Sequence, residues 1–92
     1  MNDLTVMDKE IQEELIHFLC QQFYVEVEDI HVDESLVDSG IIDSIGLIEI
    51  AAYIQKRYEY KVKNEEMNKE NFGSVNKITK FIANQLSPQQ QQ

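Results

Sequence analysis

Apolar residues in the first quarter of the chain recur at the spacing of an amphipathic helix. The positions are Ile11, Leu15, Phe18, Leu19 and Phe23. Such positions, three or four residues apart, share one face of a helix. Thr5 and Asp8 precede this stripe with the spacing of a capping box, with Asp in place of Glu. The pattern predicts a first helix from Thr5 to about Gln22.

The helical period is then lost from Tyr24 to Asp43. Acidic residues in this stretch alternate irregularly with Val25, Val27, Ile30, Val32, Leu36, Val37, Ile41 and Ile42. A connection of about 20 residues without regular structure is uncommon in a compact domain and is usually functional or disordered. Its steady supply of apolar residues predicts a loop pinned onto the core, with one short helical turn.

A second helical pattern starts directly after Asp43 and continues to about Tyr58. Gly40 supplies a permissive backbone position ahead of it. With Asp43 as the N-cap, Ile42 and Leu47 occupy the two positions of a hydrophobic staple. We expect a helix from Ser44 to Tyr58.

The last third of the chain predicts a short helical segment and one more amphipathic helix. A polar stretch leads to the acidic segment Glu65–Glu70, which we expect to form one or two helical turns. The final helix carries Val75, Ile78, Phe81, Ile82 and Leu86 at helical spacing. Ser74 is its expected cap and Pro88 its end. The fold class is therefore all-α, a small three- to four-helix bundle with a long loop between helices 1 and 2.

Composition narrows the classes of function. The 92 residues include 17 acidic and 8 basic ones, for a net charge of -9. This balance argues against binding to nucleic acid and against binding to an anionic membrane surface, since both kinds of binding depend on Lys and Arg. No apolar run approaches the roughly 18 residues of a membrane span, and the N-terminus lacks signal-peptide features. We expect a cytoplasmic monomer.

The charge is unevenly distributed. Residues 1–49 carry -12, with Lys9 as the only basic residue, and residues 50–92 carry +3. An acidic face can steer a small protein towards basic partners. A solvated surface that maintains solubility is the alternative.

The residues that could support catalysis do not form a set. His17 and His31 are the only histidines, and neither lies in a motif with a nucleophile. His17 and Cys20 share a helix face, but two ligands are too few for a metal site. Cys20 is expected to be a buried small hydrophobe. EF-hand registers that start at Asp33 or Asp38 lack the required Gly and oxygen ligands. A chain this short also has little room for an enclosed catalytic pocket, so intrinsic catalysis is not expected.

Ser44 is the most informative hydroxyl residue. As the first residue of a helix it lies where free backbone N–H groups and the helix dipole favour a phosphate. A phosphate ester on its side chain would be held favourably there. The alternative is that Asp43 and Ser44 only cap the helix.

The helix that Ser44 begins carries more apolar residues than a core face needs. Leu47, Ala51, Ile54 and Tyr58 form the stripe expected to face the core. Ile45, Ile48 and Ala52 form a second stripe beside Ser44. This second stripe suggests a protein-binding surface. A central helix packed on two sides is the alternative.

The segment around Ser44 resembles the phosphopantetheine attachment site of acyl and peptidyl carrier proteins. Gly40, two apolar residues, Asp43-Ser44-Ile45 and then Glu49 follow the family pattern, after the upstream string Leu36-Val-Asp-Ser-Gly. The order of helices and loop also matches over nearly the whole chain. The resemblance implies a carrier protein domain over residues 1–87. We expect residues 88–92 to form a disordered tail, because Pro88 ends the helix and the glutamines after it have nothing to bury.

The resemblance further implies a role for each of the matching residues. Ser44 would receive 4'-phosphopantetheine from coenzyme A through a phosphopantetheinyl transferase, with Asp43 capping the helix and engaging that enzyme. The protein would then carry acyl or aminoacyl thioesters between loading and condensing enzymes without being an enzyme itself. Partner docking would fall to Ile45, Ile48, Glu49 and Ala52. The cargo is not identified by the sequence.

Two departures from the family pattern refine these implications. Gly46 replaces a polar residue, at a cost of about 1 kcal/mol relative to Ala inside a helix, and would permit close approach of a partner. Gln55-Lys56-Arg57 is basic where fatty-acid carriers are acidic.

The string Glu70-Asn71-Phe72 resembles the corresponding string of carriers loaded by adenylating enzymes, including D-alanyl carriers. These features suggest a specialised fatty-acid, polyketide or adenylation-loaded pathway. An unmodified acidic interaction or regulatory module is the competing class.

Overall fold

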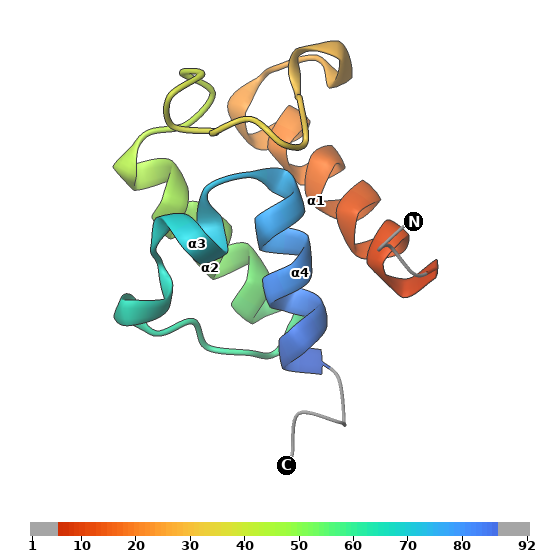
Figure 1. The fold of residues 1–92 in the computed structure, drawn as a ribbon, viewed down its shortest axis with the longest axis vertical. Coiled ribbons are helices and arrows are strands. Elements are labelled where there is room, and N and C mark those ends of the chain that lie inside the picture. The colour runs from red at the N-terminus through yellow and green to blue at the C-terminus, as the bar shows by residue number, and fades with distance from the viewer. Residues whose placement is uncertain (1–5, 87–92) are drawn as a thin grey trace.

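The computed structural model describes residues 6–86, and this part of the chain is all helical (Figure 1). The elements are α1 (Val6–Phe23), the 3-10 turn η1 (Val27–Asp29), α2 (Ser44–Tyr58), the 3-10 turn η2 (Asn64–Glu66), α3 (Lys69–Phe72) and α4 (Val75–Leu86). The prediction of an all-α bundle with a long loop between its first two helices is confirmed. The predicted Thr5 cap and the tail at 88–92 lie outside the described residues, and the domain boundary at residue 87 stays a prediction.

One core joins the four helices. Its buried apolar residues are Ile11, Leu15, Leu19, Ile30, Leu36, Ile42, Ile50, Ile54, Phe72, Val75, Ile78, Phe81 and Ile82. Helix α4 lies closest to α1 and α3, as Figure 1 also shows. The stripes predicted on the first and last helices therefore face each other across the core.

The long loop is held onto the core as predicted. Leu36 and Ile42 bury their side chains, and the Leu36 N–H donates to the Gly73 carbonyl at 3.0 Å. Asn76 of α4 donates its backbone N–H to the Val32 carbonyl and its side-chain amide to Asp33. The predicted short helical turn in the loop is η1. Buried apolar anchors and backbone hydrogen bonds thus replace regular structure along this segment.

The segment between α2 and α4 forms two short turns. Of the one or two helical turns predicted at 65–70 the structure has two, η2 and α3, and the Asn68 side chain accepts the N–H of Asn71 at the start of α3. Tyr60 donates to the Glu66 carboxylate at 2.8 Å, which closes the loop that follows α2. Ser74 caps α4 as predicted, since its Oγ accepts the Lys77 N–H at 3.2 Å. None of the helices within residues 6–86 is long and apolar enough to cross a membrane.

Candidate functional site

A tight turn delivers the chain to the start of α2. The Leu36 carbonyl accepts the N–H groups of Ile41 and Ile42, at 3.1 and 3.2 Å. Gly40 adopts φ +87°, a left-handed conformation that favours glycine. The turn buries Ile42 and leaves the next two residues, Asp43 and Ser44, exposed.

Asp43 is the N-cap of α2, as the sequence predicts. Its backbone is extended, and its Oδ1 accepts the Gly46 N–H at 2.9 Å. Its carbonyl accepts the Leu47 N–H at 3.1 Å. The remaining N–H groups of the first turn, on Ser44 and Ile45, have no acceptor within a helix.

Ser44 is the first residue of α2 and its side chain is exposed. It lies on the edge of a cavity of about 330 Å³ between the start of α2, the long loop and α3. The lining is mostly apolar and includes Val37, Leu47, Met67 and Phe72. An accessible hydroxyl at the positive end of a 15-residue helix fits a phosphate ester, and the open cavity leaves room beside it.

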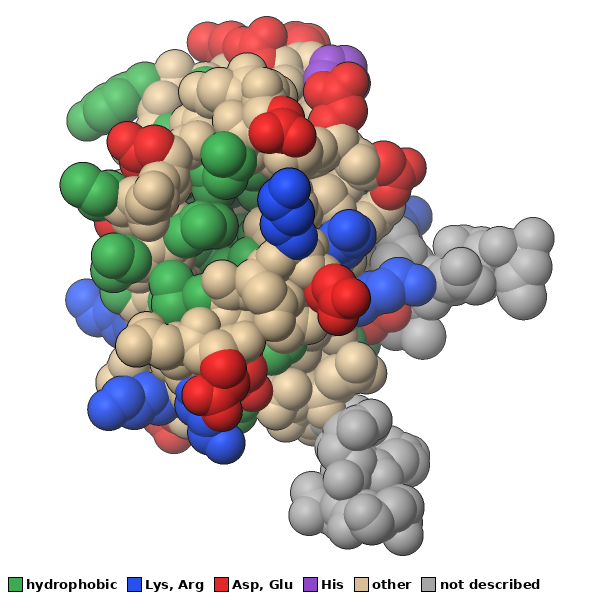
Figure 2. Space-filling view, turned by 60° about the vertical axis from the view of Figure 1, so that its left-hand side comes forward, with side chains coloured by type: hydrophobic (Ala, Val, Ile, Leu, Met, Phe, Trp, Pro, Cys, Tyr) green, Lys and Arg blue, Asp and Glu red, His purple; other side chains and the backbone are tan. Residues whose placement is uncertain are grey.

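The second apolar stripe of α2 is exposed. Ile45 and Ile48 are 64% and 59% exposed, and Ala52 is exposed as well. Figure 2 shows hydrophobic side chains gathered on the face turned forward from the left of Figure 1, with both acidic and basic side chains around them. The structure therefore excludes the alternative in which both stripes of α2 are covered by the bundle.

The core face of α2 differs from the expected stripe. Its buried residues are Gly46, Ile50 and Ile54, whereas Leu47, Ala51 and Tyr58 are only half-buried. Ile54 is buried as predicted, and Leu47 and Tyr58 are partly buried against the core. The predicted stripe missed Gly46 and Ile50, which are buried. Gly46, Ile50 and Ile54 are spaced four residues apart, as one helix face requires. The sequence pattern did not reveal this face because glycine has no apolar side chain to mark it.

Gly46 does not serve the approach of a partner, contrary to the sequence-based expectation. It is buried, and a Cβ atom there would lie 2.7 Å from the Cβ of Ile42 and 3.2 Å from Cε1 of Phe23. The close approach is made by the chain itself, between α2, the loop before it and the end of α1. Glycine is required here because any side chain would overlap the core.

Glu49 is turned towards α1 rather than towards the exposed stripe of Ile45 and Ile48. It is half-buried, and its carboxylate accepts a hydrogen bond of 2.6 Å from Gln22 of α1. Ala52 lies at the border between the two surfaces, since it belongs to the exposed stripe and also lines a groove between α1 and α2. The docking candidates thus occupy two adjoining surfaces.

The basic end of α2 is also partly engaged with α1. Arg57 donates two hydrogen bonds of 3.0 Å to the Glu14 carboxylate, and its guanidinium lies 5.1 Å from the Tyr58 ring centroid. The hydrogen bond from Arg57 to Glu14 raises the pKa of the guanidinium. Lys56, in contrast, is exposed and forms no ion pair within the part of the chain that the structure describes.

Cys20 is half-buried against the core, and burial raises the pKa of its thiol. A raised pKa disfavours the nucleophilic thiolate. Among the described residues, no three His, Cys, Asp or Glu side chains are grouped so that they could hold a metal ion.

Comparison with known proteins agrees with this geometry. The family model described as "Phosphopantetheine attachment site" matches residues 13–82. The D-alanyl carrier protein of Streptococcus uberis is 34% identical over 72 residues, covering 78% of this chain and 90% of that protein. The D-alanyl carrier protein of Streptococcus sanguinis is 30% identical over 73 residues, covering 79% and 91%. No solved structure gives a significant match. The chain therefore belongs to the phosphopantetheine attachment-site family, whose members are carrier proteins rather than enzymes and hold a covalently attached 4'-phosphopantetheine.

Proposed function

We propose that Ser44 is the residue that receives the phosphopantetheine group. The observation that carries this proposal is the position of Ser44, exposed as the first residue of a capped helix. The helix dipole and the free N–H groups of the first turn favour the phosphate there. The family match spans this position as well.

The chain supplies an acceptor hydroxyl, and a separate transferase supplies the activation. The Ser44 oxygen forms a bond to the phosphorus next to the pantetheine moiety of coenzyme A. The pyrophosphate bond to the adenosine nucleotide breaks, and the serine proton passes to the transferase. When attached, the arm supplies a terminal thiol on which cargo is held as a thioester. Asp43 holds the start of α2 in place and presents its charge beside the reacting oxygen.

We further propose that the cargo is an aminoacyl group, loaded by an adenylating enzyme. The relatives from S. uberis and S. sanguinis are D-alanyl carrier proteins, so D-alanine is the first cargo to test. The Glu70-Asn71-Phe72 string supports the same class, and Phe72 lines the cavity beside Ser44. Partner enzymes would dock on Ile45, Ile48 and Ala52, which are exposed beside Ser44.

Intact-mass measurement tests the attachment. The protein is incubated with coenzyme A, magnesium and a permissive phosphopantetheinyl transferase, and we expect a gain of one phosphopantetheinyl group. Ser44→Ala is expected to abolish the gain. Ser39→Ala is the matched control, because Ser39 is also exposed and lies in the same turn. No gain at all would favour an unmodified interaction module, and a gain that survives Ser44→Ala would place the attachment on another residue and overturn the assignment to Ser44.

A loading assay tests the cargo. The modified protein is incubated with ATP, D-alanine and a streptococcal ligase that adenylates D-alanine, and thioester formation is measured by mass. Parallel reactions offer L-alanine with the same ligase and a fatty acid with an acyl-adenylating ligase. Loading by the fatty acid alone would place the protein in a fatty-acid or polyketide pathway, and the attachment result would be unaffected.

A further inference from the structure

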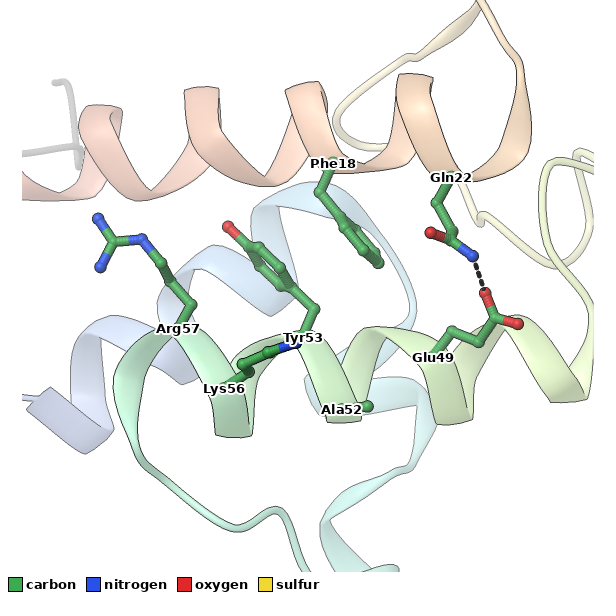
Figure 3. A pocket seen from close by; sticks show the side chains of 7 residues that line it. All are labelled: Phe18, Gln22, Glu49, Ala52, Tyr53, Lys56 and Arg57. Carbon is green, nitrogen blue, oxygen red and sulfur yellow. Dashed lines mark hydrogen bonds between the residues drawn. The ribbon is translucent and has the colours of Figure 1, made fainter.

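An apolar groove of about 500 Å³ runs between α1 and α2, on the side of α2 next to its exposed stripe (Figure 3). We call it the α1–α2 groove. It is lined by Phe18, Gln22, Glu49, Ala52, Tyr53, Lys56 and Arg57. Phe18 and Tyr53 stack with ring centroids 4.3 Å apart, which joins the two helices through side chains. The groove is open to solvent, so it suits side chains of a docked protein better than a small ligand, which enclosed pockets bury almost completely.

The polar groups of the α1–α2 groove are arranged asymmetrically. At the end nearer Ser44, Gln22 donates to Glu49 and closes the groove (Figure 3). At the other end Arg57 is held by Glu14, and each of these two side chains is about half exposed. Lys56 also lies on this rim, and it forms no ion pair with any of residues 6–86. The unpaired positive charge on the far rim is therefore that of Lys56 alone, next to an apolar floor. The hollow beyond Arg57 is acidic, since Glu10 and Glu13 line it together with Glu14.

We propose that the α1–α2 groove is a second docking site, occupied by an apolar side chain of a partner protein that carries a carboxylate opposite Lys56. Charge complementarity selects the acidic occupant. Ala52 makes the groove continuous with the exposed stripe of Ile45 and Ile48, so one partner can cover both. A helix laid in a groove between two helices buries anchors of this kind. A second copy of this chain is disfavoured, because two molecules of charge -9 repel each other.

Probe peptides test the proposal without knowledge of the partner. The acidic probe is a synthetic amphipathic helix with Leu and Phe on one face and Glu on the flanks. The basic probe has Lys in place of each Glu. Each is titrated into the full-length 15N-labelled protein, and amide shifts and Kd are measured by NMR. We expect the acidic probe to shift Phe18, Ala52 and Tyr53 and to bind more tightly than the basic probe.

Three variants test whether the acidic probe binds in the α1–α2 groove. Lys56→Glu is expected to weaken the acidic probe at least about fivefold, equivalent to about 1 kcal/mol, and to improve binding of the basic probe. Lys80→Glu on α4 is the matched control, because Lys80 is an exposed lysine that does not line the groove. Ala52→Glu places a carboxylate within the groove and is expected to exclude the acidic probe.

The docking proposal is independent of the attachment chemistry. Ser44→Ala is expected to bind the acidic probe as the native chain does, whereas it loses modification. Three results would overturn the docking proposal: absence of shifts in the groove, equal binding of the two probes, or equal effects of Lys56→Glu and Lys80→Glu.

Discussion

Gly46 packs directly against Ile42, so that a Cβ atom on residue 46 would lie 2.7 Å from the Ile42 Cβ. The atom met is close to the backbone of Ile42 and cannot swing aside as the end of a long side chain would. Phe23 closes the other side, with Cε1 at 3.2 Å. This contact locks the start of α2 against the end of α1.

Gly46→Ala is therefore expected to destabilise the protein. In an exposed helix the change would stabilise by about 1 kcal/mol, but overpacking of a core costs about 1–3 kcal/mol. We expect the overpacking to prevail, with a lower midpoint of urea unfolding. The pair Gln55→Gly and Gln55→Ala, at an exposed position of α2, measures the intrinsic preference on the same helix. If Gly46→Ala raised the unfolding free energy of the native chain by as much as Gln55→Ala exceeds Gln55→Gly, the steric argument would be refuted.

Asp43 has two roles that substitutions can separate: its side-chain oxygen caps α2, and its carboxylate carries a charge. Asp43→Ala removes the acceptor of the Gly46 N–H and is expected to cost about 1 kcal/mol of unfolding free energy. Asp43→Asn keeps a capping oxygen and should retain most of that stability. Comparison of modification rates for Asp43→Asn and the native chain then reports on the charge alone. Equal stability of the Ala and Asn variants would show that the cap contributes little.

The exposed stripe predicts a clear contrast between neighbouring isoleucines. Ile48 is 59% exposed, so Ile48→Asp is expected to change stability by less than about 0.5 kcal/mol while it impairs thioester transfer to a partner enzyme. Ile50 is fully buried, and Ile50→Asp is expected to unfold the bundle. Circular dichroism and urea unfolding measure both. Loss of helicity in Ile48→Asp would mean that this stripe is needed for the fold.

The environment of Tyr60 leads us to expect that the stability of the protein falls as the pH becomes alkaline. Burial, together with its hydrogen bonds to Glu66, raises the pKa of Tyr60 from 10.0 to about 12. The unfolded chain therefore loses the phenolic proton at a lower pH than the folded chain does. The stabilisation is fully present below pH 10 and is lost as pH rises towards 12.

Tyr60→Phe cannot titrate, so its unfolding free energy should fall less steeply from pH 9.5 to 11.5 than that of the native protein. Urea unfolding at several pH values in this range measures the slope. Burial also raises the pKa of Tyr53 and Tyr58, and these two residues contribute the same trend to both proteins. Parallel slopes in the two proteins would contradict the effect assigned to Tyr60.

Local pattern was sufficient for the helices and for the surroundings of Ser44. The start of α2 at Ser44 and its end at Tyr58 were both predicted, because a capping Asp and the run of apolar positions after it are properties of adjacent residues. Ile45 and Ile48 were predicted as a protein-binding stripe, but the alternative of a helix packed on two sides was excluded only by their exposure in the structure. The sequence left open whether the 65–70 segment forms one helical turn or two, because the hydrogen bonds from Tyr60 to Glu66 and from the Asn71 N–H to Asn68 decide it.

The sequence by itself thus determined the helical class, the capped start of α2, the accessible serine and the resemblance that implies its modification. Only the tertiary structure decided that Gly46 is an internal contact, that Ile50 belongs to the core, and that α1 and α2 enclose a groove. The bonds that shape the groove join residues 27 and 43 positions apart, Gln22 to Glu49 and Glu14 to Arg57. Helical spacing specifies which residues share a face, but the distance and rotation between two helices depend on how all the side chains of the core fill space together.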